Sequence, residues 1–168
     1  MQFRIAIVLT LIVCRSLSAM IVFSTDGHYK FVHRLQEFLK LNNIGSEIIE
    51  LKNTTLLKVK IPHKIRKIYL AFSLQKSVKF NNEVYGLIPI TLVTGVHLKK
   101  KKIVLKKLNS FNSDSAKGVF YINNQGMIEG YSCIIVPPDG TRMGIIFKAA
   151  THLLQSWKQF ATKINVEP

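Results

Sequence analysis

The sequence predicts an α/β protein with an open, mainly parallel sheet and flanking helices, a Rossmann-like lobe. Residues Met20–Leu51 read as an apolar strand (Met20–Ser24), an amphipathic helix (His28–Asn42) and a second strand (Ser46–Leu51). Further apolar runs recur at intervals of roughly 20 to 26 residues, with helical or irregular segments between them. This order is typical of parallel strands that are joined by helical crossovers and buried under them.

The first helix has the most regular pattern in the chain. Thr25 or Asp26 can cap its start, and Gly45 follows its end where a left-handed residue would stop a helix. Its apolar side chains fall on one broad stripe: Phe31, Val32, Leu35, Phe38 and Leu39.

The same patterns predict the remaining elements. Leu57, Val59 and Ile61 alternate with polar residues and predict an edge strand or an irregular link. Four further strands are expected, at Lys67–Phe72, Leu87–Thr94, Gly118–Ile122 and Arg142–Phe147. Helical segments are expected at Ser73–Phe80, Gln125–Val136 and Ala149–Ile164.

The composition indicates a folded and strongly basic protein. Of its 168 residues 48% are hydrophobic, which allows a packed core and argues against disorder. The 24 Lys and Arg residues against 9 Asp and Glu residues give a formal net charge of +15. Such a charge favours anionic neighbours, although a solvated lysine-rich surface is an equally ordinary explanation.

The first nineteen residues resemble an export signal. A basic start (Met1–Arg4), an apolar segment (Ile5–Cys14) and small residues before Ala19 predict cleavage after Ala19 and a periplasmic or secreted protein. An uncleaved membrane anchor is the alternative. The predicted organisation is a signal peptide at 1–19, an α/β lobe at 20–117, and a crossover with one strand and one helix at 118–168. Cleavage would leave Cys133 as the one cysteine, which excludes an internal disulfide.

No motif predicts catalysis. The sequence contains no HExxH, GxSxG, P-loop or GxGxxG motif. His28 and His33 are five residues apart, which is the wrong spacing for two metal ligands on one helix face. Cys133 lies in an apolar stretch and is predicted to be a core cysteine. We therefore predict a protein that is not an enzyme and that holds no cofactor or metal.

Small polar residues follow three of the predicted strands. They are Ser24, Thr25, Ser73, Thr94 and Gly95. In open parallel sheets, ligands bind beyond the carboxyl ends of the strands, so these residues predict a site for a small polar ligand. Helix capping alone is the alternative explanation for such residues.

A basic run extends over Lys99–Lys107, as a basic strand or amphipathic turn. Its lysines predict contact with an anionic membrane surface, or a solvated sheet edge that discourages association. They are Lys99, Lys100, Lys101, Lys102, Lys106 and Lys107. The run has no interleaved aromatic residues and no arginine cluster, so no specific binding of nucleic acid is expected.

Three segments resemble a known family. Pro89–Gly95 (PITLVTG), Gly118–Gln125 (GVFYINNQ) and Pro137–Phe147 (PPDGTRMGIIF) are similar to parts of ABC-transporter substrate-binding proteins with a type I periplasmic-binding fold. The resemblance implies that Ser24, Thr25, Thr94 and Gly95 face an inter-lobe cleft and that the partner is an ABC permease.

The chain departs from this family in two places. Ala71-Phe72-Ser73 replaces a glycine-bearing turn, and the second lobe is reduced to one strand and one helix. A shortened substrate-binding protein is thus the first functional hypothesis. The alternative is a basic envelope-associated protein that binds anionic surfaces or partner proteins through Lys99–Lys107.

Overall fold

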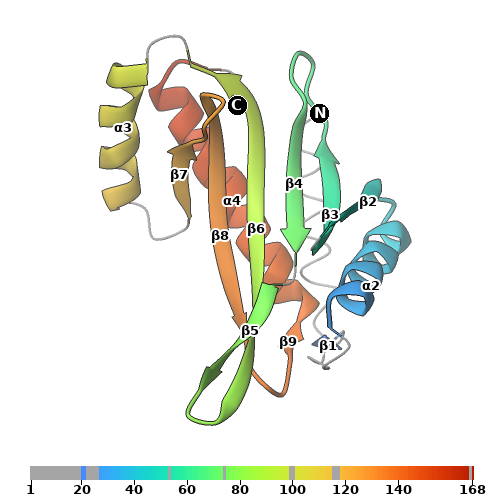
Figure 1. The fold of residues 1–168 in the computed structure, drawn as a ribbon. Helices are drawn as coiled ribbons and strands as arrows, with labels where there is room; N and C mark the ends of the chain where they lie inside the picture. Colours follow the sequence, from blue (N-terminus) through green and yellow to red (C-terminus); the bar gives the residue numbers. More distant parts are fainter. Residues whose placement is uncertain are drawn as a thin grey trace.

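The computed structural model describes residues 20–21, 27–52, 54–73, 75–98, 101–114, 118–166 and 168 (Figure 1). The described helices are α2 (Gly27–Leu41), α3 (Lys101–Asp114) and α4 (Met143–Lys163). The described strands are β1 (Met20–Ile21), β2 (Ser46–Leu51), β3 (Thr54–Ile61), β4 (Ile68–Ser73), β5 (Gln75–Phe80), β6 (Glu83–His97), β7 (Val119–Ile122), β8 (Met127–Val136) and β9 (Thr141–Arg142).

The main sheet is antiparallel, so the predicted parallel α/β fold is wrong. Its seven strands follow the order β2-β3-β4-β6-β8-β7, with β5 paired to β6. Every pairing in this sheet is antiparallel. Strand β1 pairs instead with β9 in a separate two-stranded sheet, so Met20–Leu51 does not form a βαβ unit.

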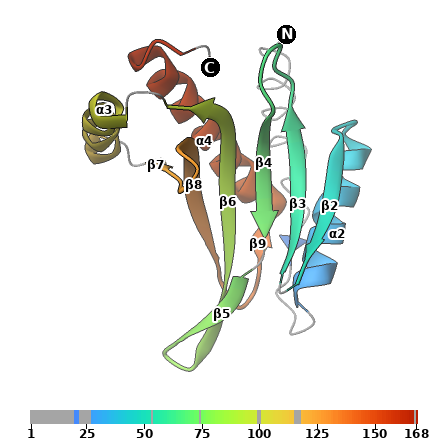
Figure 2. The same cartoon turned by 45° about the horizontal axis from the view of Figure 1, so that its top comes forward.

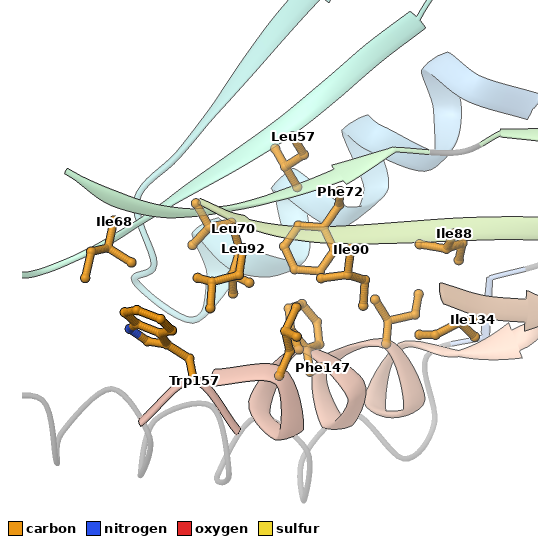
Figure 3. Close-up of a cluster of buried hydrophobic side chains, with 14 of the residues drawn as sticks. Leu57, Ile68, Leu70, Phe72, Ile88, Ile90, Leu92, Ile134, Phe147 and Trp157 are labelled. Atoms are coloured by element: carbon orange, nitrogen blue, oxygen red, sulfur yellow. The ribbon is translucent and has the colours of Figure 1, made fainter. Parts of the chain in front are cut away.

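Helices α2 and α4 cover the same face of the sheet (Figure 2). Phe38 of α2 stacks on Phe147 of α4 with 5.3 Å between ring centroids, and Phe72 of β4 meets Phe147 edge-on. In Figure 3, Phe72, Ile90 and Phe147 point toward one another between the sheet and α4. The core is thus a single layer of side chains between one sheet and two helices.

Aromatic rings close the core near β7. Phe120 stacks on Phe160 with 5.7 Å between centroids, and Phe111 of α3 lies 5.1 Å from Phe160. Gly130 of β8 lies beneath Phe120, where a Cβ atom would come within 2.7 Å of the ring. Helix α3 is attached to the sheet edge through this aromatic cluster.

Several predicted elements are confirmed with small shifts at their ends. The helix predicted at His28–Asn42 is α2, the strand predicted at Ser46–Leu51 is β2, and the strand predicted at Lys67–Phe72 is β4. The strand at Gly118–Ile122 is β7, and the final helix is α4.

Three other elements have the wrong type. Ser73–Phe80 and Gln125–Val136 were expected to be helical, but they contain β5 and β8. Arg142–Phe147 was expected to be a strand, but α4 already begins at Met143. Met143, Ile146 and Phe147 are buried together on one face of that helix, so packing overrides the strand propensity of the isoleucines.

The predicted boundary between the two lobes falls inside the main sheet. The proposed division between 117 and 118 separates β6 from β8, and these two strands pair from Gly86↔Val136 to Val93↔Glu129. The strands on both sides of the division therefore belong to one sheet. None of the described helices is long and apolar enough to cross a membrane.

Strands β5 and β6 extend beyond the sheet as a hairpin (Figure 1). Asn81 and Asn82 form its tip, with φ angles of 49° and 64°, both in the left-handed region. Two such residues are the requirement of a type I′ turn, for which asparagine is well suited.

Candidate interaction surfaces

We predicted that Thr94 contacts a ligand, but its side chain makes hydrogen bonds within the sheet. Its side chain is fully buried, and its Oγ1 donates a hydrogen bond of 2.6 Å to the carbonyl oxygen of Ile128. The same oxygen accepts a bond of 3.2 Å from the backbone N–H of Val96. Both bonds hold β6 where its register with β8 shifts between Val93 and His97.

Gly95 has a backbone role at the same irregularity. Its φ is +66°, and an added Cβ would lie 3.1 Å from the carbonyl oxygen of Lys67. Both the left-handed conformation and the close approach favour glycine. The conformation of this bulge is therefore sufficient to explain why threonine and glycine occupy positions 94 and 95.

Ser73 is buried at the end of β4, far from Thr94. Its neighbour Phe72 pairs with Ile90, four residues before Thr94 on β6. Ser73 and Thr94 are therefore separated by about five residues of strand, or roughly 17 Å. The structure does not bring these two residues together, because antiparallel neighbours end at opposite edges of a sheet.

Ser24 and Thr25 lie outside the described residues, as do Lys99 and Lys100. The predicted ligand site assumed that the carboxyl ends of parallel strands meet at one edge. This assumption is wrong for Ser73 and Thr94, because β4 and β6 are antiparallel and their carboxyl ends lie at opposite edges of the sheet.

The basic run forms part of a helix rather than a strand or turn. Lys101 and Lys102 lie in the first turn of α3, and Lys106 and Lys107 are exposed on its next turn. Leu105, between these lysines, is also exposed. The helix therefore presents apolar and cationic groups side by side.

The end of α4 adds a further lysine to this surface. The Nζ of Lys107 donates a hydrogen bond of 2.9 Å to the carbonyl oxygen of Lys163 at the end of α4. The Nζ of Lys163 in turn lies 5.2 Å from the centroid of the Phe111 ring of α3. We call Lys106, Lys107 and Lys163 the basic ridge.

The sheet has a second face, which neither α2 nor α4 covers. On β6, Ile88, Ile90 and Leu92 point to the helices and are fully buried, so the alternating residues point away from them. We call this surface the open face. Residues of four neighbouring strands point to it, and they include Leu56, Lys58, Lys60, Tyr69, Ala71, Ser73, Leu87, Pro89, Thr91, Val93, Glu129, Tyr131, Cys133 and Ile135. Ser73, Pro89 and Val93 are nevertheless buried within the single chain.

The open face is largely apolar and aromatic. Ile135 is 65% exposed, and Tyr121 and Tyr131 on β7 and β8 are each more than a third exposed. Cys133 is exposed there as well, so its predicted place in the core is wrong. The sequence signal for this surface was the alternation of residues in β8, which we interpreted as helical spacing.

Glu129 is the centre of a polar group on this face. It accepts hydrogen bonds of 2.6 Å from the hydroxyl of Tyr121 and of 2.7 Å from the side-chain amide of Asn123. Burial, and next the hydrogen bond to Glu129, raise the pKa of Tyr121 to about 12. Burial, and next the negative charge of Glu129, raise the pKa of Tyr69.

Two lysines on β3 carry positive charge across the open face from the Glu129 carboxylate on β8. The Nζ of Lys58 lies 4.6 Å from the centroid of the Tyr69 ring, a cation–π geometry. Lys60 is paired with Tyr69 in the sheet register and is exposed. The open face thus carries positive charge over β3 and negative charge over β8.

The described residues contain no group of three or more His, Cys, Asp or Glu side chains that could hold a metal ion. No protein-family model and no curated protein sequence matches the chain. Function is therefore inferred from the two surfaces just described.

Proposed function

We propose that the protein is a non-enzymatic interaction protein that binds anionic membrane surfaces through the basic ridge. The observation that carries this proposal is the grouping of Lys106, Lys107 and Lys163 at the junction of α3 and α4. Lysines grouped at one place on the surface attract phosphate-bearing surfaces, and each lysine near such a surface contributes about 1 kcal/mol. The net charge of +15 adds a long-range attraction.

The position of the lysines in α3 supports this role. Lys101, Lys102, Lys106 and Lys107 all fall within the first half of the helix, and its first turn holds no acidic residue. Cations near a helix N-terminus oppose the helix dipole and cost up to about 1 kcal/mol. An anionic surface at this end of the helix would offset that cost. Leu105 supplies an apolar side chain that can enter the headgroup region.

Vesicle binding tests the proposal. The purified full-length protein is sedimented with phosphatidylcholine vesicles, with or without an anionic phospholipid. We expect binding to the anionic vesicles that weakens as salt is added. The double variant Lys106→Gln/Lys163→Gln keeps the backbone carbonyl that Lys107 contacts and should weaken binding about 30-fold, from about 1 kcal/mol per lysine.

The matched control removes the same charge elsewhere. Lys148 and Lys158 are exposed on α4 and lie outside the basic ridge. Lys148→Gln/Lys158→Gln should keep most of the affinity. Equal losses in the two double variants would show that net charge alone drives binding, and binding to neutral vesicles would contradict the proposal.

The shortened substrate-binding protein stays a prediction without structural support. Its fold was expected to be parallel with two lobes, and the described strands form one antiparallel sheet. Of its ligand residues, Thr94 and Gly95 have roles in the β6 bulge, and Ser73 lies away from them.

A further inference from the structure

We infer that the open face is a homodimer interface, on which a second copy of the chain packs face to face. The first observation is that strand β6 carries apolar side chains on both faces of the sheet. Leu87, Pro89 and Val93 point away from the helices, yet they are apolar like Ile88 and Ile90 on the covered side. Pro89 and Val93 are already buried in the single chain, and Leu87 is partly exposed. A strand with one solvated face normally alternates apolar and polar residues, whereas a strand buried on both faces does not.

The sheet order permits a symmetric partner. The path β2-β3-β4-β6-β8-β7 has its midline between β4 and β6. A two-fold axis along the strands at this midline places β4 of one copy over β6 of the other, and β3 over β8. Aligned sheets of this kind pack about 10 Å apart at about 30°.

The charges of the open face are complementary under this rotation. Lys60 pairs with Tyr69, Tyr69 with Val93, and Val93 with Glu129, so Lys60 and Glu129 lie in one row across the sheet. The two-fold axis exchanges the ends of this row. Each Lys60 then faces Glu129 of the second copy, which fixes both the partner and its register.

The next row is complementary in size. Lys58 pairs with Ala71, Ala71 with Thr91, and Thr91 with Tyr131. The same rotation places the small residues Ala71 and Thr91 over each other at the centre and Lys58 over Tyr131 at the sides. Small central residues allow two sheets to approach closely, and the outer pairs have cation–π chemistry.

The hairpin extends this interface. Val78 pairs with Tyr85 and Phe80 with Glu83, which places all four on the face shared with Leu87. Phe80 is 64% exposed in the single chain. Because the hairpin lies at the midline of the sheet, the hairpins of two copies meet along the axis and bury these side chains.

The expected dimer is one of moderate affinity. Six strands spaced by about 4.8 Å, over about 20 Å of strand, give roughly 500 Å² per copy before the hairpins are counted. Specific interfaces bury about 800 Å² per partner. The like net charge of the two copies also opposes association, and salt screens it. Dimerisation should therefore strengthen with salt, whereas binding of the basic ridge to vesicles weakens.

Analytical ultracentrifugation of the full-length protein over a range of concentrations tests the inference. We expect a reversible monomer–dimer equilibrium. Thr91→Lys places a charge at the centre of the open face and should weaken the dimer at least tenfold. Thr162→Lys adds the same charge on the exposed side of α4 and should leave it unchanged. A monomer at every concentration would overturn the inference.

A charge exchange tests the register. Lys60→Glu and Glu129→Lys should each weaken the dimer, and the double variant should recover most of the lost affinity. Circular dichroism checks that Glu129→Lys, which also loses the bonds from Tyr121 and Asn123, remains folded. Losses that simply add in the double variant would exclude this register.

Cross-linking gives an independent test that avoids Glu129. Leu56 pairs with Ser73, and Pro89 pairs with Cys133, so the rotation places Leu56 of one copy near Cys133 of the other. Leu56→Cys should be joined to Cys133 of the second copy by a short bismaleimide cross-linker, because facing residues of sheets about 10 Å apart are too distant for a disulfide. Gln159→Cys, on the exposed side of α4, should not. Equal cross-linking of both variants, or a Cys133 that no thiol reagent reaches in a monomer, would contradict the dimer.

Discussion

The two faces of the sheet differ in what covers them rather than in how apolar they are. Leu92 lies against the helix layer and is fully buried, whereas Leu87 on the same strand belongs to the open face. The helices α2 and α4 account for the burial of the first face. The comparison teaches that an apolar strand can indicate a sheet face that none of the described helices covers.

The largest expected difference between the faces is in stability. Leu92→Ala should lower the free energy of unfolding by about 2–5 kcal/mol, because it leaves a cavity between sheet and helices. Leu87→Ala makes the same change on the open face and should cost less than about 1 kcal/mol. Urea unfolding at low protein concentration measures both. Equal losses would show that another part of the chain covers the open face.

A smaller effect is expected from packing on the covered side of β8. Gly130→Ala should lower the free energy of unfolding by about 1–3 kcal/mol, since its Cβ would come within 2.7 Å of Phe120 and 3.1 Å of Leu153. A Cβ added at Gly45 would have no atom within 4 Å, so Gly45→Ala should change the free energy of unfolding by less than about 1 kcal/mol. Thermal melting compares them, and equal effects would contradict the close approach at Gly130.

The smallest expected effect lies in the polar group of the open face. Tyr121 should titrate at about pH 12 instead of 10.0, as measured by its ultraviolet absorbance. Glu129→Gln should lower that pKa toward 10.0, because the carboxylate and its hydrogen bond favour the neutral phenol.

The sign of the pH dependence follows from this shift. The folded state holds the Tyr121 proton more tightly than the unfolded chain does. Its contribution to stability is therefore complete below about pH 10 and is lost as the pH rises toward 12. An unchanged Tyr121 titration in Glu129→Gln would exclude the bond to Glu129 as a cause.

Local sequence patterns predicted several elements because their own residues determine them. Helix α2 has one apolar stripe from Phe31 to Leu39, and the buried face of α4 repeats at helical spacing through Trp157 and Ala161. Strands β2, β4 and β7 are short apolar runs between turns. In the basic run, the prediction found the lysines and missed the helix that carries them.

The sequence by itself thus determined where the chain turns, which residues are apolar and where positive charge accumulates. It did not determine strand partners, because an apolar run such as Leu87–Thr94 fits a parallel strand and an antiparallel strand with two apolar faces equally well. Pairing of β6 with β4 and β8 is a contact between distant segments, and no local pattern encodes it. Tertiary structure alone decided that Thr94 supports a bulge, that Cys133 is exposed and that Lys60 and Glu129 share one row of the open face.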